Sequence, residues 1–244
     1  MSANPFQVAC YGLSDIGRAR SNNEDVFRAL LPQQFFVLAD GMGGHNAGEV
    51  AAEKAVESLC ISIGSAKKPS TTEEGCSLLR RAIKIANETV FTLAQRHKAY
   101  SGMGTTLSCF LLQGEMLLYA HVGDSRLYRM RGKLERLTQD HSLRHAMLTS
   151  EDKPRPRLYR NVITRAVGTH TYVHPDVGII PLKRGDIYIL CSDGLTDFIS
   201  EETIAKVLHH FLVHGLEKAA KTLVSLALKA GGSDNITVLI VKIL

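Results

Sequence analysis

The 244-residue sequence has few cysteines: there are five, an odd number, with no C-x-x-C pair and no paired histidines nearby. A disulfide framework uses paired cysteines, and a zinc site needs cysteine or histidine ligands at short spacing. The sequence therefore argues against both, and we expect reduced, mostly buried thiols at Cys10, Cys60, Cys76, Cys109 and Cys191.

Long hydrophobic runs are also missing. The longest, residues 107–112 and 236–240, are far shorter than the ~20 residues of a membrane-spanning helix. Residues 1–10 lack the basic start and the apolar centre of a signal peptide. We therefore expect a cytoplasmic protein that does not associate with membranes.

The sequence contains neither an internal repeat nor a long Pro/Gly/Ser linker, so residues 1–244 are expected to form a single domain. Hydrophobic residues make up 45% and charged residues 22%, which excludes a disordered, collagen-like or coiled-coil chain. With 29 basic and 24 acidic residues the net charge is +5. This excess is mild and mostly scattered, so no nucleic-acid partner is expected.

Apolar and β-rich runs broken by Gly, Asn and Pro predict strands, and apolar positions at helical spacing predict helices. The predicted strands are residues 6–14, 26–30, 35–40, 105–112, 117–122, 126–130, 134–137, 186–191 and 236–244. The predicted helices are residues 48–63, 73–94, 201–211 and 216–230. Hairpins followed by paired helices indicate an α+β fold with mostly antiparallel sheets.

Acidic residues follow several predicted strands directly. Asp40, Asp124 and Asp193 each come after an apolar run and are followed by a turn, and Asp234 comes just before the last strand. A single Asp-Gly after a strand is usually only a turn. Neighbouring antiparallel strands start and end at the same edge of a sheet, so all four carboxylates, with Glu24-Asp25 in another turn, can share one edge.

Clustered carboxylates repel one another and persist when a cation compensates their charge. Carboxylates, backbone carbonyls and water suit hard cations such as Mg²⁺ and Mn²⁺, and none of the ten histidines forms a metal-binding pattern. Two such cations about 3.5–4 Å apart can generate a bound hydroxide and clamp the oxygens of a phosphoryl group. The acidic turns therefore favour hydrolysis of phosphate esters.

Arg20, four residues before Glu24, can supply the contact to phosphate. A guanidinium binds two phosphate oxygens with parallel hydrogen bonds. The alternative for this residue is an ordinary surface arginine in a polar turn.

Two glycine-rich stretches also stand out. Residues 40–48 contain no G-K-[S/T] nucleotide motif, and we expect their missing side chains to let the backbone approach a metal, with the carbonyl of Gly41 as a ligand. For residues 101–105, a glycine turn leading into a buried strand is the simpler interpretation.

These residues together resemble the PPM (PP2C-type) serine/threonine phosphatases in their bacterial form. The matching stretches are R-x-N-N-E-D from Arg20, D-G-M-G-G-H-x-x-G-E from Asp40, G-M-G-T-T from Gly102, V-G-D-S-R from Val122, S-D-G-L from Ser192 and D-N from Asp234. They occur in the family's order and extend from about residue 14 to the end of the chain.

The resemblance implies two stacked, mainly antiparallel β-sheets flanked by antiparallel helix pairs, an αββα sandwich with two Mn²⁺ or Mg²⁺ ions at one edge. By this match Asp40 bridges the two metals and Gly41 offers its carbonyl. Asp193 and Asp234 complete the ligands of the first metal. Arg20, Asp40, Asp193 and Asp234 are the expected catalytic residues.

The same resemblance assigns the remaining acids. Glu24 and Asp25 act close to the second metal, partly through water. Asp124 matches the acid that helps Asp193 to hold a third, weaker metal in bacterial members. Arg20 matches the arginine that binds the substrate phosphate.

The sequence departs from the family pattern at two places. Met42 stands where eukaryotic members have a histidine proposed as general acid, as is usual in the bacterial branch, so the leaving group must be protonated by metal-bound water or another residue. Bacterial relatives also carry a longer flap where this chain has a short basic stretch at residues 153–160. This stretch is either a solvated loop or a surface for acidic and phosphorylated proteins.

The leading hypothesis is metal-dependent hydrolysis of phosphoserine and phosphothreonine in proteins by direct attack of a metal-activated hydroxide. No cysteine is placed as a nucleophile, so no covalent phosphoenzyme is expected. One alternative is a pseudophosphatase that binds phosphoproteins without catalysis, and another is a regulatory phosphatase dedicated to one partner. The expected partners are phosphorylated proteins, including a Ser/Thr kinase or its substrates, and the expected state is a monomer.

Overall fold

The computed structural model describes residues 6–43, 47–143, 162–211 and 215–244, and its strands form two antiparallel sheets. The spatial order of the first sheet is β1 (Val8–Asp15), β11 (Ile236–Ile243), β10 (Ile187–Cys191), β7 (Arg126–Arg131) and β8 (Lys133–Arg136). The order of the second is β2 (Asp25–Leu30), β3 (Phe35–Met42), β5 (Leu107–Gln113), β6 (Met116–Val122) and β9 (Asp176–Pro181), with the short β4 (Gly104–Thr105) also paired to β3.

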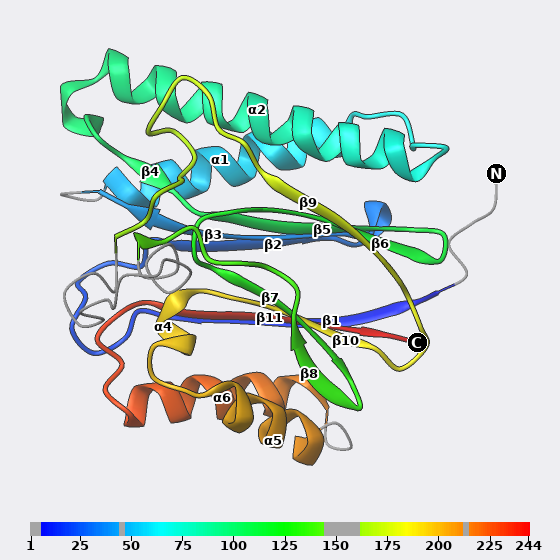
Figure 1. Cartoon of the computed structure of the whole chain (residues 1–244). Helices are drawn as coiled ribbons and strands as arrows, with labels where there is room; N and C mark the ends of the chain where they lie inside the picture. Colours follow the sequence, from blue (N-terminus) through cyan, green and yellow to red (C-terminus); the bar gives the residue numbers. More distant parts are fainter. Residues whose placement is uncertain (1–5, 44–46, 144–161, 212–214) are drawn as a thin grey trace, which may run out of the picture.

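Helices cover the outer faces of both sheets, so the molecule has four layers (Figure 1). The helices over the second sheet are α1 (Ala47–Gly64) and α2 (Thr72–Arg96). Those beside the first sheet are α4 (Asp193–Thr196), α5 (Glu201–Phe211) and α6 (Leu216–Lys229). Short 3-10 turns occur at Leu31–Gln33 and Lys98–Tyr100. This is the αββα sandwich that the family resemblance implied.

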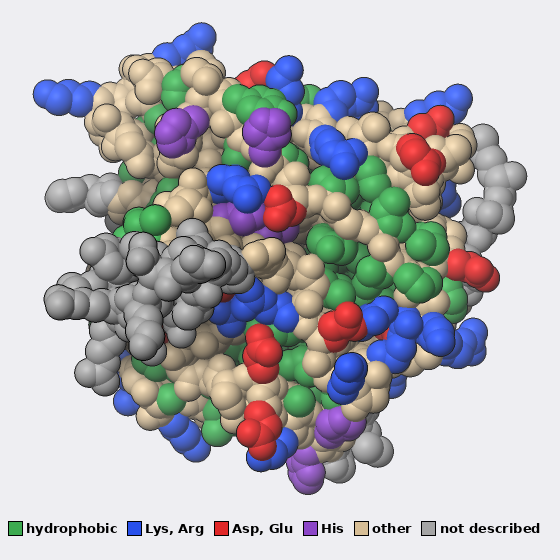
Figure 2. Space-filling view, viewed as in Figure 1, with side chains coloured by type: hydrophobic (Ala, Val, Ile, Leu, Met, Phe, Trp, Pro, Cys, Tyr) green, Lys and Arg blue, Asp and Glu red, His purple; other side chains and the backbone are tan. Residues whose placement is uncertain are grey.

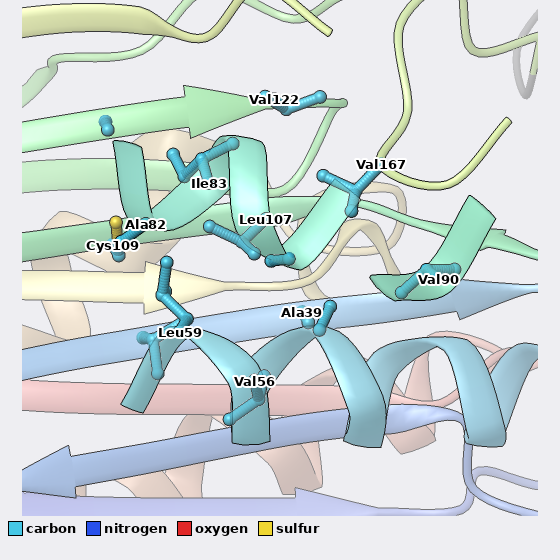
Figure 3. Packing of buried hydrophobic residues seen from close by; sticks show 14 of the residues in the cluster. Ala39, Val56, Leu59, Ala82, Ile83, Val90, Leu107, Cys109, Val122 and Val167 are labelled. Carbon is cyan, nitrogen blue, oxygen red and sulfur yellow. The ribbon is translucent and has the colours of Figure 1, made fainter. Parts of the chain in front are cut away.

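Three layers of buried hydrophobic side chains hold these four layers together. One lies between α1, α2 and the second sheet, where Leu59 and Ile83 from the helices meet Leu107 and Val122 from the strands (Figure 3). Another lies between the first sheet and helices α5 and α6. The third lies between the two sheets and includes the stacked rings of Phe36 and Phe110.

The strands at the centre of each sheet are buried on both faces, which explains their nearly continuous apolar sequences. In β3, Phe35 and Val37 point into the core below the helices, whereas Phe36 and Leu38 point into the core between the sheets. Successive side chains of a strand point to opposite faces, so a strand between two cores needs hydrophobic residues at every position. Strand β10 follows the same rule with Tyr188 facing the inter-sheet core.

Most elements predicted from the sequence are confirmed within one or two residues, and all four long helices are present. Among the described residues, strand β9 and helix α4 were not predicted. Strand β9 contains Gly178 and Pro181 and pairs only with β6 among the described strands, so its pattern was weak. Helix α4 is a single short turn. The strand predicted over residues 105–112 is divided at Thr106, and the basic stretch at 153–160 lies outside the described residues.

The surface agrees with the expectation of scattered charge. On the face seen in Figure 2, basic and acidic side chains are interspersed, and hydrophobic side chains gather over the edge formed by β6 and β9. Ile179 of β9 is one of the exposed large hydrophobic residues. Among the described helices, none combines the length and apolar composition needed to cross a bilayer.

Candidate functional site

The predicted acidic residues lie at one end of the sandwich, opposite the end where β1 begins and β11 ends (Figure 1). In the second sheet, Asp25 of β2 is directly opposite Asp40 of β3, and Asp124 follows the end of β6. In the first sheet, Asp193 follows β10 and begins α4, and Asp234 comes just before β11. Both sheets therefore contribute acids to the same end of the molecule.

Hydrogen bonds between distant parts of the chain connect the two sheets at this end. The Ser192 hydroxyl, after β10, donates to Asp25 Oδ2 at 2.8 Å. The backbone N–H of Glu24 donates to Asn235 Oδ1, before β11, also at 2.8 Å. These bonds join positions more than 150 residues apart in the chain, and they fix the acidic turns of one sheet against those of the other.

The electrostatics indicate that the carboxylates crowd one another. Burial, with further contributions from Asp25 and Asp193, raises the pKa of Asp40 well above its ordinary value. Burial also raises the pKa of Asp193 strongly, and Asp124 and Asp234 add to this effect. Groups so placed hold their charge only with difficulty unless a cation is near.

Asp25 and Asp124 are nearly fully buried, and each has an oxygen that no described residue contacts by a hydrogen bond. Burial raises the pKa of each to about 6, although Thr237 and Ser192 partly oppose the effect at Asp25. Within the described residues, Asp25 Oδ1 and Asp124 Oδ1 are buried and accept no hydrogen bond. An unsatisfied buried acceptor is costly, and carboxylate oxygens are the ligands that hard cations prefer. The donor set therefore fits Mg²⁺ or Mn²⁺.

The acidic side chains described above do not surround one common metal position. Across the described ranges, no three histidine, cysteine, aspartate or glutamate side chains stand together as a ready metal-binding group. Asp234 instead contacts Arg20, and Asp25 contacts Ser192. The assignment of individual ligands therefore stays a prediction.

The glycines at this end are required by close packing of the chain. A Cβ atom on Gly41 would lie 2.1 Å from the carbonyl oxygen of Gly48, and one on Gly48 would lie 2.4 Å from Glu24 Oε2. The N–H of Gly41 also donates to the carbonyl of Glu24 at 3.0 Å. The start of α1 is thus pressed against β3 and Glu24, which gives these glycines a packing role independent of any metal.

Arg20 lies at the rim of the acidic group. Its guanidinium donates to Asp234 Oδ2 at 2.8 Å, and about half of its side-chain surface is exposed. This hydrogen bond raises the pKa of Arg20, and the charges of Glu24 and Asp40 act in the same direction. The expected phosphate-binding arginine is therefore beside the acids and open to solvent.

Sequence reasoning treated residues 101–105 as a glycine turn leading into a buried strand and gave its threonines no role, yet the structure places Thr105 and Thr106 against the backbone of Asp40. The N–H of Asp40 donates to Thr106 Oγ1 at 2.9 Å, and its carbonyl accepts from Thr106 N–H at 2.8 Å and from the Thr105 hydroxyl at 2.9 Å. Thr106 Oγ1 also lies 2.7 Å from the hydroxyl of Ser125, next to Asp124. The pair of adjacent threonines directly after the glycine turn was the feature of the sequence that could have indicated these hydrogen bonds.

Comparison with known proteins supports the family resemblance found in the sequence. A sequence profile of the family described as protein phosphatase 2C matches residues 17–229. The serine/threonine phosphatase Stp of Listeria monocytogenes is 36% identical over 94% of this chain and 93% of its own length.

Solved structures are similar over nearly the whole chain. The serine/threonine phosphatase Stp1 from Staphylococcus aureus has a TM-score of 0.90 at 33% identity, covering 100% of this chain and 98% of that one. The catalytic domain of the serine/threonine phosphatase PstP, solved in complex with two manganese ions, has a TM-score of 0.86 at 34% identity, covering 97% and 98%. The chain therefore belongs to the protein phosphatase 2C family of serine/threonine phosphatases.

Proposed function

We propose that this chain removes phosphate from phosphoserine and phosphothreonine in proteins at a centre of two Mn²⁺ or Mg²⁺ ions. The observation that carries the proposal is the group of carboxylates from both sheets, in which Asp25 and Asp124 are buried and each have an oxygen that finds no hydrogen-bond partner among the described residues. Since both sheets contribute, we also propose that residues 1–244 act as one domain. Phosphoproteins, including a Ser/Thr kinase or its substrates, are the proposed partners of a monomeric enzyme.

The proposed metal ligands are the acids at this end of the sandwich and the carbonyl of Gly41. Asp40 would serve both ions, Asp193 and Asp234 would complete the ligands of the first, and Glu24 and Asp25 would lie near the second. Asp124 would hold a third ion together with Asp193. When bound, two such ions supply a water of lowered pKa and offset negative charge on the phosphoryl oxygens. Excess carboxylate charge at the site supports this assignment, because it is the charge that divalent cations would neutralise.

Arg20 would bind the substrate phosphate. Its planar guanidinium can make two parallel hydrogen bonds to phosphate oxygens, which would fix the orientation of the phosphoryl group at the rim of the acids. The exposure of Arg20 supports this role, because substrate can reach it without a rearrangement of the core. Binding would replace the contact of Arg20 to Asp234 with contacts to phosphate.

The cysteines offer no competing nucleophile. Burial raises the pKa of Cys109 and of Cys191 to about 12, so both remain protonated thiols at neutral pH. Burial also raises the pKa of Cys10, Cys60 and Cys76. A thiolate is the nucleophilic form of cysteine, so a phosphocysteine intermediate is not expected.

The test is the rate of hydrolysis of a phosphothreonine peptide with Mn²⁺, with Mg²⁺ and with a chelator. We expect turnover only with metal, and a loss of more than about 100-fold for Asp40→Asn, which removes a proposed bridging ligand. Glu135→Gln is the matched control, since this carboxylate on β8 is exposed and pairs with Arg129. Turnover in the chelator, or an active Asp40→Asn variant, contradicts the proposal.

A further inference from the structure

The loop that carries Arg20 connects the end of β1 to the start of β2 and has no regular secondary structure of its own. A long exposed arginine on such a loop has many accessible positions, and fixing it in one place costs conformational entropy. If Arg20 binds phosphate, something outside the loop must hold its backbone. The structure provides such a contact through Asn235, a residue to which the sequence analysis gave no role.

The side chain of Asn235 binds the loop on both sides of Arg20. Its Nδ2 amide donates one hydrogen bond to the carbonyl of Ile16 and one to the carbonyl of Asn22, each at 2.9 Å. Its Oδ1 accepts from the N–H of Glu24 at 2.8 Å. Asn235 is 6% exposed, so these bonds are shielded from water. Both amide hydrogens are used, and a shorter or apolar side chain would leave all three backbone groups without this partner.

The same loop packs closely against the residues before Asn235. The N–H of Arg18 donates to the carbonyl of Gly232 at 2.7 Å. Gly17 has a φ of +80°, and a Cβ atom there would lie 2.1 Å from the carbonyl oxygen of Asp234. The loop and the turn before β11 therefore form one packed unit, with the Asn235 side chain as its polar centre.

We infer that Asn235 is a positioning residue for phosphate recognition: it closes the loop around Arg20 and so fixes the guanidinium beside Asp234. The inference rests on the proposed role of Arg20. It follows that removing the Asn235 amide weakens the binding of phosphate through Arg20, although Asn235 itself touches neither phosphate nor metal. An effect of this kind is specific to the loop and differs from a general loss of stability.

The first measurement compares Asn235→Ala with Asn87→Ala. Asn87 is a matched control, because it is 1% exposed and also binds backbone groups with both ends of its amide, at His170 and Gly168. We expect Asn235→Ala to raise the inhibition constant of inorganic phosphate and the KM for a phosphothreonine peptide by about tenfold, with a smaller change in kcat. Asn87→Ala is expected to change the melting temperature only.

A double-mutant cycle with Arg20→Ala separates this inference from the proposed function. If Asn235 acts through Arg20, the double variant Arg20→Ala/Asn235→Ala binds phosphate no more weakly than Arg20→Ala alone. If Arg20→Ala weakens phosphate binding but Asn235→Ala does not, or if the two effects add, the inference is wrong while the role of Arg20 stands. If Arg20→Ala has no effect, the proposed role of Arg20 fails, and the inference fails with it.

A second variant keeps the test decisive if Asn235→Ala does not fold. Asn235→Asp retains the acceptor for the N–H of Glu24 but removes both donors to the loop. We expect the same increase in the inhibition constant of phosphate. Calorimetric titration with Mn²⁺ accompanies each variant, and a loss of Mn²⁺ binding as large as the loss of phosphate binding would place Asn235 with the metal ligands and overturn the inference.

Discussion

Arg20 and Asp234 contact each other, although the proposed mechanism gives them different roles. Asp234 is a proposed metal ligand, and its Oδ2 accepts a hydrogen bond from the arginine that is proposed to bind phosphate. A cation that needs this oxygen must compete with the guanidinium. Metal binding would therefore release Arg20 toward the substrate, and an arginine occupied by phosphate would free Asp234 for metal.

The competition can be measured directly. We expect Arg20→Ala to bind Mn²⁺ about two- to fivefold more tightly than the unmodified protein, because an exposed ion pair contributes little and its loss removes the competitor. Isothermal titration with Mn²⁺ alone is the measurement. Arg28→Ala is the control, since Arg28 pairs with Glu53 and is exposed to a similar extent. Unchanged or weaker binding in Arg20→Ala contradicts this account.

A second prediction at the residue scale concerns pH. The pKa of Asp124 is about 6 in the fold and about 4 in an unfolded chain. Between these two pH values Asp124 binds more protons in the folded state than in the unfolded state. Its contribution to the free energy of unfolding therefore falls as pH rises from about 4 to about 6, and does not change further at higher pH. Buried His121, whose pKa is lowered to about 3, has the opposite slope. The free energy of unfolding must therefore be compared between the Asp124→Asn variant and the unmodified protein at the same pH.

We expect Asp124→Asn, in chelator, to raise the free energy of unfolding by about 2 kcal/mol at pH 7.5 and by little at pH 4. In excess Mn²⁺ at pH 7.5 the unmodified protein should instead be more stable than Asp124→Asn, because only the carboxylate can bind a cation strongly. Denaturant unfolding at the two pH values is the measurement. A gain that is equal at both pH values would show that the Asp124 charge is not its cause.

At the scale of elements, the interruption between β4 and β5 supports the acidic end of β3. Opposite Asp40, the Thr106 hydroxyl takes the place of a backbone acceptor, and the strand predicted as continuous is divided there. The same hydroxyl lies beside Ser125 in the turn that carries Asp124. One side chain therefore links two strand ends that both present acids.

Substitutions at Thr106 separate its hydroxyl from its volume. Thr106→Val keeps the shape but leaves the N–H of Asp40 without its acceptor, and we expect about tenfold weaker Mn²⁺ binding. Thr106→Ser keeps the hydroxyl and is expected to bind Mn²⁺ like the unmodified protein. Isothermal titration of both variants is the measurement. Equal losses in the two would indicate that packing, and not the hydrogen bond, supports Asp40.

The limits of prediction from sequence follow from the same elements. Strands β3, β10 and β11 lie between two cores, so their continuous apolar runs are easily recognised in the sequence. An acid next to such a run therefore lies where the strand begins or ends. Strand β9 lacks this signal because its residues are partly exposed and include a glycine and a proline. The family resemblance supplied the stacking of the two sheets, which local patterns do not contain.

At the scale of the whole molecule, the candidate site draws its acids from both sheets. Asp25 and Asp40 lie in strands of one sheet, and Asp193 and Asp234 lie next to strands of the other. Asp124 lies in the turn that leads from β6, in the sheet of Asp25 and Asp40, to β7 in the other sheet. The sequence could indicate that these acids lie at strand ends. It could not indicate the bonds of Asn235 or the pairing of Arg20 with Asp234, because these join positions more than 200 residues apart through the packing of complete layers.

The net charge of +5 also gains a different meaning at this scale. The basic excess is spread over the surface, whereas one end of the sandwich concentrates carboxylates whose pKa values are raised by burial and by one another. Such a group of acidic side chains on a basic protein is suited to hold divalent cations, whose positive charge would then attract a phosphate.

The most direct test of this account is a crystal structure of the protein soaked with Mn²⁺, with the ions located by their anomalous scattering. The account predicts two manganese ions at the acidic end, in contact with Asp40 and with Asp193 or Asp234. A crystal that binds no manganese there, or binds it only at other surfaces, would contradict the central claim that the two sheets together form a metal centre.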